Sequence, residues 1–140
     1  MNSVYFALLA AFFWGVAPIF GKLGVRSLDP LAALAIRSGI VTATLAVTVI
    51  FLGKCSSVWQ ATPREVGFIS LEGLFAALLG QLAYYYALKY GEASQVVPVV
   101  AAFPLVALVV GLVVLQEKIM WWQTAGAVLI TVGIALINYR

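Results

Sequence analysis

The sequence predicts an all-α, polytopic membrane protein with five transmembrane helices. Of its 140 residues, 64% are hydrophobic and only 9% are charged, whereas about a quarter of the residues in a soluble domain are charged. A hydrocarbon core about 30 Å thick needs roughly 20 residues of helix to cross it, and the chain contains several uncharged stretches of that length. The predicted spans are residues 4–25, 31–52, 65–88, 93–115 and 120–137, within a single domain of residues 1–140.

The composition also excludes several classes of function. There is one cysteine, Cys55, and no histidine, so the chain lacks an intramolecular disulfide and the usual ligands of a metal cluster. The HExxH and GxSxG patterns of hydrolases are missing as well. The net charge of +3 is scattered along the chain, whereas nucleic-acid binding requires basic residues gathered on one face. We therefore expect no enzymatic activity, no cofactor, no metal and no nucleic-acid partner.

In the first span, the less ordinary side chains share one helical face. They follow one another at intervals of three or four residues, and they are Ala11, Trp14, Gly15, Pro18 and Lys22. This face is a candidate lining for an aqueous path. Lys22 lies about one turn from the end of the span, so it either faces that path or extends along the helix to the membrane interface.

The second span contains an arginine well inside the membrane. Pro30 suits the first turn of this helix, and Arg37 follows about 10 Å deeper by helical rise. A charged side chain at that depth is costly in lipid, so Arg37 should point into the protein or into a water-filled cavity. It either contacts a substrate or pairs with a carbonyl or carboxylate of the protein.

The third span combines polar side chains with small ones. Glu72 lies two turns from its start, Gln81 near its middle and Tyr85 toward its far end. Glu72 either carries a proton or forms a salt bridge. Two pairs of small residues spaced by four allow close contact with another helix; they are Gly73 with Ala77 and Ala76 with Gly80.

The fourth span contains two prolines within 24 uncharged residues, Pro98 and Pro104. Interrupted helices near the middle of the membrane recur where transporters bind their substrates. Prolines are also simply more frequent in membrane helices than in soluble ones, so both interpretations stay open. Ser94 and Pro98 lie on the same face of this span.

The fifth span follows the charged pair Glu117 and Lys118 and begins with Trp121 and Trp122, which suit the lipid interface. With Arg37 left out because it lies within the second span, the lysines and arginines divide almost evenly between the two sides of the membrane: Lys54, Arg64 and Lys118 against Lys22, Arg26, Lys89 and Arg140. The positive-inside rule therefore does not select one orientation. Insertion in both orientations and insertion in one orientation are equally compatible with this distribution.

Many transporters are built from two inverted repeats with the substrate site between them, and this chain looks like one such half of a ten-helix fold. Two copies would supply the whole. In an antiparallel pair, Glu72 of one copy would lie at about the depth of Arg37 and Lys22 of the other.

Four stretches of this sequence, in their order and spacing, resemble the EamA family of the drug/metabolite transporter superfamily over nearly the full length. They are FWGVAPIFGKLG, DPLAALAIRSGI, LAYYYALKYGEAS and VVPVVAAFPLVALVVGLVVLQEKIMWWQTAGAVLITVGIALI. Members of the family commonly carry two such units in one chain, so the resemblance implies that this chain works as a homodimer. It also implies export or exchange of small metabolites through a central cavity lined mainly by spans one, three and four.

The resemblance implies which positions line that cavity, and these are Trp14, Pro18, Gln81, Tyr85, Ser94 and Pro98. Lys22 and Arg37 match the basic positions of the family near the ends of spans one and two. We expect Arg37 to join the substrate-binding residues, and Lys22 and Glu72 to act in gating or coupling. The related small multidrug-resistance proteins carry an acidic residue in their first span, and span one here has none.

These features together predict a secondary transporter. We expect it to move a small polar metabolite, such as an amino acid, by alternating access and as a homodimer surrounded by lipid. Its expected location is the cell membrane, specifically the inner membrane of a prokaryote. The alternative is a non-transporting or flippase-like membrane subunit that requires a partner chain.

Overall fold

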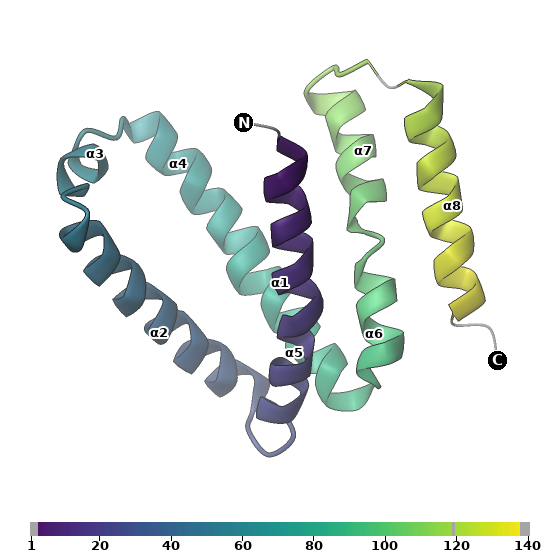
Figure 1. Ribbon diagram of the computed structural model, residues 1–140, viewed down its shortest axis with the longest axis horizontal. Coiled ribbons are helices and arrows are strands. Elements are labelled where there is room, and N and C mark those ends of the chain that lie inside the picture. Colours follow the sequence, from purple (N-terminus) through teal and green to yellow (C-terminus); the bar gives the residue numbers. More distant parts are fainter. Residues whose placement is uncertain (1–2, 119, 138–140) are drawn as a thin grey trace. The chain divides into compact units, whose positions relative to one another are not determined.

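The computed structural model describes residues 3–118 and 120–137, and nearly all of these residues are helical (Figure 1). No strand occurs within these two ranges. The chain divides into two compact units, Met1–Tyr90 and Gly91–Arg140. Four helices or helical runs are long and apolar enough to cross a membrane: Ser3–Gly24, Pro30–Phe51, Pro63–Tyr90 and Ala93–Val114. The prediction of an all-α membrane protein is therefore confirmed.

The first unit begins with two long helices, α1 (Ser3–Gly24) and α2 (Pro30–Phe51). The start of α2 follows from its sequence, because Asp29 accepts hydrogen bonds from the backbone N–H groups of Leu31 and Ala32. Pro30 occupies the first turn, where its missing N–H is not needed. A capping carboxylate and a proline at adjacent positions thus fix where the helix begins.

The interval of residues 53–64, which is the longest polar stretch, includes one short helix, α3 (Cys55–Trp59). The next helix, α4 (Pro63–Glu72), begins with a capping box. The Thr62 hydroxyl accepts from the backbone N–H of Glu65, while the Glu65 carboxylate accepts from the backbone N–H of Thr62 at 2.8 Å. This reciprocal pair satisfies two of the N–H groups left without partners at a helix start.

The third span is one continuous helical run, Pro63–Tyr90, but it changes its helical type in the middle. Between α4 and α5 (Gln81–Tyr90) lies a π-helical segment, η1 (Gly73–Gly80). In such a segment each backbone N–H reaches back five residues instead of four. The sequence predicted a single regular helix over residues 65–88, so the π segment is a structural feature that the apolar pattern did not indicate.

The core of the first unit is small and lies where α5 packs against α1 and α2. Leu88 of α5, Val25 at the end of α1 and Leu34 of α2 are 0%, 1% and 2% exposed, and Tyr85 is buried beside them. Most other large apolar side chains of this unit are exposed. That distribution suits a chain whose helices face lipid rather than water.

The second unit contains α6 (Ala93–Val100), α7 (Phe103–Val114) and α8 (Trp121–Ile137). Helices α6 and α7 together form the fourth span, which is interrupted by a turn at Ala101 and Ala102 (Figure 1). Helix α8 packs against α6. It is apolar and has 17 residues, at the lower end of the length that crosses a bilayer.

Helix α7 ends in a turn with an unusual backbone conformation. Gln116 has a φ of 54°, which is the left-handed region that glycine adopts most easily. The backbone N–H groups of Leu115 and Glu117 both donate to the carbonyl oxygen of Gly111, each at 3.1 Å. The turn thus closes the helix by supplying donors to a carbonyl in its last turn.

Candidate functional site

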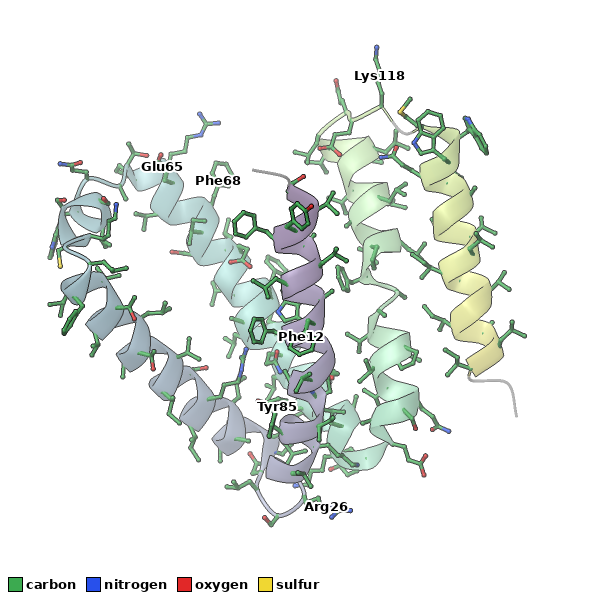
Figure 2. The ribbon with its side chains drawn as sticks, in the orientation of Figure 1. Phe12, Arg26, Glu65, Phe68, Tyr85 and Lys118 are labelled. Atoms are coloured by element: carbon green, nitrogen blue, oxygen red, sulfur yellow. The ribbon has the colours of Figure 1, made fainter. Side chains whose placement is uncertain are left out.

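Two of the predicted site residues, Lys22 and Tyr85, lie where α1 contacts α5, and a third, Pro18, lies one turn before Lys22 on α1. Pro18 is buried, Lys22 is half-buried and Tyr85 is 8% exposed. Figure 2 labels Tyr85 beside the lower half of α1. The two helices lie close together at Gly21, because a methyl group built at this position would be in ordinary contact with Leu88 Cδ1 at 3.4 Å and with Tyr85 Cε1 at 3.6 Å.

Two lysines hold this region together across the chain. Lys22 Nζ donates to the backbone carbonyl of Leu88, and Lys89 Nζ donates to the backbone carbonyl of Leu28 at 3.2 Å. We refer to these two hydrogen bonds as the lysine clasp. They join the end of α1 and the following turn to the last turn of α5.

The bond from Lys22 to Leu88 has a clear electrostatic reason. The carbonyls in the last turn of a helix lack helical donors and carry the negative end of the helix dipole, so an ammonium group is favoured there. Leu88 lies in the last turn of α5. The helical pattern suggested that Lys22 faces a water path or the interface, and the family resemblance suggested a role in gating or coupling. Its bond to a backbone carbonyl was missed because a carbonyl has no signature in the sequence.

The other predicted residues of the first unit lie outside this cluster. Trp14 is 68% exposed on α1, Arg37 is exposed on α2, and Glu72 is exposed at the end of α4. Gln81 is half-buried at the first position after the π segment. The charges of Arg37 and Glu72 thus both lie on exposed faces of membrane-spanning helices.

In the second unit, Ser94 and Pro98 lie on α6, just before the interruption of the fourth span. Ser94 is exposed and Pro98 is half-buried. Pro104 lies in the first turn of α7, where the missing N–H of proline is tolerated. The interruption is thus bounded by the two prolines that the sequence analysis had singled out.

Metal-binding side chains do not gather in groups of three or more anywhere in residues 3–118 and 120–137. The polar chemistry available there consists of ammonium, guanidinium, carboxylate and amide side chains, together with backbone groups at the helix interruption. Such groups bind a small polar molecule through hydrogen bonds and charge.

Comparisons with known proteins agree with this architecture. The chain is 29% identical to an uncharacterized transporter encoded in the cobO 3′ region of Sinorhizobium sp, over 95% of this chain and 94% of that protein. It is also 29% identical to an uncharacterized protein of Methanocaldococcus jannaschii, over 98% of this chain and 96% of the relative. Both relatives are therefore of nearly the same length as this chain.

A longer relative is the uncharacterized transporter YvbV of Bacillus subtilis, which is 24% identical over 99% of this chain but only 45% of its own length. No solved structure matches the chain significantly. The model of the EamA-like transporter family matches residues 1–139. This multi-pass membrane protein therefore belongs to the EamA-like transporter family, as its sequence pattern had indicated.

Proposed function

We propose that the protein is a secondary transporter of a small polar metabolite, with amino acids as the first class to test, and that it works by alternating access in the cell membrane. The observation that supports this most directly is the interruption of the fourth span between α6 and α7. Discontinuous helices of this kind form the substrate and ion sites of several transporter folds.

The interruption leaves backbone groups near the middle of the membrane. Ala101 lies eight residues after the start of α6, which is about 12 Å along the helix axis. Pro98 and Pro104 have no N–H, so the carbonyls of Ser94 and Val100 lack the donor that a regular helix supplies. Because unsatisfied backbone groups cost several kcal/mol each in hydrocarbon, irregular backbone at this depth suits a water-filled or protein-lined cavity.

Substrate contacts are assigned in this proposal to Trp14, Pro18, Arg37, Gln81, Tyr85, Ser94 and Pro98. The guanidinium of Arg37 would bind a carboxylate of the substrate, because a fork of donors matches two carboxylate oxygens. Gln81 would supply hydrogen bonds. Lys22 and Glu72 would act in gating or coupling. The lysine clasp fits a gating role for Lys22, since separating α1 from α5 requires breaking its bond to Leu88.

The proposed assembly is a homodimer, with an antiparallel pair as the arrangement to test. Arg37 and Glu72 are exposed on spans, although a charged side chain within a bilayer normally faces protein or water. In one copy they also lie nearer to opposite faces of the membrane, about 10 Å and 14 Å from the first residue of each span. A second copy in the opposite orientation would bring an arginine and a carboxylate of opposite charge to similar depths.

The test is counterflow with purified protein in liposomes. Vesicles loaded with a mixture of unlabelled amino acids are diluted into a ¹⁴C-labelled mixture of the common amino acids, and uptake is compared with that of protein-free vesicles. We expect transient accumulation in the protein-containing vesicles alone. Equal uptake in both preparations would overturn the proposed substrate class and would favour a subunit that requires a partner chain.

The same assay tests the role of Arg37. Arg37→Ala should lower uptake more than Lys22→Ala does, because we assign Arg37 to substrate binding and Lys22 to gating. Lys54→Ala serves as the matched control, since this lysine is exposed in the loop before α3. Uptake by Arg37→Ala equal to that of the parent would remove Arg37 from the mechanism.

A further inference from the structure

The π segment η1 is longer than most of its kind. It extends over eight residues, Gly73–Gly80, whereas π-helical backbone appears mostly as single-turn bulges inside α-helices and is frequent at functional sites. It lies directly between two residues of proposed function, Glu72 and Gln81. This change of helical type alters the angle between those two side chains around the helix axis.

One glycine lies against the backbone of the π segment. A methyl group built at Gly80 would lie 3.0 Å from the backbone oxygen of Phe75, five residues earlier in the same segment. A backbone oxygen held in a helix cannot move aside as the tip of a flexible side chain can. At Gly73, the other end of the segment, a built methyl group meets nothing within 4 Å. A side chain is therefore crowded at position 80 of the π segment but not at position 73.

The segment also changes the angle between the two halves of the span. In an α-helix each residue turns the chain by about 100°, so Glu72 and Gln81, nine residues apart, would lie about 180° from each other. A π segment absorbs roughly one extra residue within its wider turns. The effective separation becomes eight residues, and the two side chains lie about 80° apart. They consequently point toward the same side of the span.

The two halves of the span are not equally anchored. Helix α5 packs against α1 and α2 and buries Tyr85 and Leu88, and the lysine clasp holds its last turn. Helix α4 buries none of its residues. A change from π to α geometry would thus leave α5 in place and turn α4, together with Glu72, by about 100°.

We propose that the π segment positions the Glu72 carboxylate on the same side of the third span as the Gln81 amide, and that Gly80 is the positioning residue that maintains it. This inference rests on the proposed function and deepens it. The two groups form one polar strip for a substrate that carries both a cationic group, which the carboxylate attracts, and a hydrogen-bonding group, which the amide binds.

The test compares Gly80→Ala with a compensating deletion. Single cysteines are introduced at each position from 66 to 72 in a Cys55→Ser background, and their reaction with a membrane-permeant maleimide is measured. In Gly80→Ala, the pattern of reactive positions should move one residue toward the C-terminus. Deleting Ala77 in addition removes the extra residue, so the pattern should return to that of the parent. Gly73→Ala is the matched control and should leave the pattern unchanged.

Transport is the second measurement, with counterflow of the ¹⁴C-labelled amino-acid mixture as the probe. Gly80→Ala should lower uptake by about tenfold or more, because misplaced binding groups lose much of their effect, and the added deletion should restore most of it. A glycine needed only for close packing would not be rescued by shortening a helix. The span has 28 residues, so it still crosses the membrane after one is removed.

An unchanged cysteine pattern in Gly80→Ala would overturn the proposal, and so would a shifted pattern without a loss of uptake. If Gly80→Ala does not fold, the variant that lacks Ala77 but keeps Gly80 provides the test. It should keep the cysteine pattern and the uptake of the parent. A cysteine pattern that differs from that of the parent would refute the inference. Failure of the proposed function can be distinguished from failure of this inference. If the proposed function is wrong, the parent protein shows no counterflow, but its pattern of reactive cysteines can still be measured.

Discussion

The ammonium group of Lys22 donates a hydrogen bond to the backbone carbonyl of Leu88, a residue 66 positions later in the chain. Leu88 is fully buried, and Gly21 next to Lys22 allows its side chain to approach α1. One polar contact and one apolar contact thus coincide where α1 meets α5. The stability of the first unit should depend on both of them.

Removing the ammonium group should weaken this contact. Lys22→Met keeps a long apolar side chain but leaves the Leu88 carbonyl without that donor. We expect the free energy of unfolding to fall by about 0.5–2 kcal/mol, the range found for hydrogen bonds between membrane helices. The apparent free energy of unfolding by SDS titration measures it. Lys54→Met, at an exposed loop position, is the control. If Lys54→Met loses as much stability as Lys22→Met, the effect comes from removing any lysine and not from breaking the clasp.

The apolar contact between α1 and α5 can be tested by placing a larger side chain at position 21. Gly21→Ala should be nearly neutral, since the new methyl group would make ordinary contacts at 3.4 and 3.6 Å. Gly21→Ile should destabilise the protein by about 1–3 kcal/mol, because it overfills the space between α1 and α5. Gly15→Ile is the matched control on the same helix, where a built methyl group meets nothing within 4 Å. If both isoleucine variants unfold at the same SDS fraction, α1 does not pack closely against α5.

Backbone strain at the end of α7 leads to a stabilising substitution. Gln116 adopts a φ of 54°, and a side chain in this region costs about 1–2 kcal/mol that glycine avoids. Gln116→Gly should therefore raise the free energy of unfolding by about 1 kcal/mol. Gly53 also has a positive φ, 63°, and here the opposite substitution can be made. Gly53→Ala should lower the free energy of unfolding by a similar amount. Thermal unfolding in detergent measures both, and a destabilised Gln116→Gly protein would contradict the argument.

The interruption of the fourth span should be required for transport and not for folding. Pro104→Ala restores an N–H that a continuous helix can use, so α6 and α7 should join more readily and uptake of labelled amino acids should fall. The thermal unfolding temperature should stay the same or rise, because a helical hydrogen bond is gained. Pro63→Ala, at the start of α4, is the control and should not affect uptake. Full transport by Pro104→Ala would show that the interruption has no part in the mechanism.

The apolar runs and the capping residues of the sequence predicted the helices well. Pro30 begins α2 as expected, and the helical run Pro63–Tyr90 covers the predicted span of residues 65–88. These features are local, because caps and prolines act on the residues next to them. The prolines also marked the interruption of the fourth span, although the sequence alone did not distinguish an interruption from an ordinary membrane proline.

Two features escaped the sequence analysis for physical reasons. The π segment depends on how the backbone turns, and its residues look the same as those of an apolar α-helix. Gly80 was interpreted as half of a pair that contacts another helix, whereas its nearest neighbour is the oxygen of Phe75 in its own segment. The partner of Lys22 is a carbonyl, which every residue possesses. The predicted substrate residues stay predictions, because neither the fold nor the related proteins identify a substrate.

The small core of the first unit has a consequence for how the protein changes shape. In the described part of this unit, the buried apolar side chains are Val25, Leu34, Tyr85 and Leu88, together with Pro18 and Pro30. Lipid tails are as apolar as leucine, so separating two helices in a bilayer exposes no side chain to water. The helices thus keep most of their stability individually, and their mutual arrangement is held by a few contacts. A change in their arrangement therefore has to break only these few contacts.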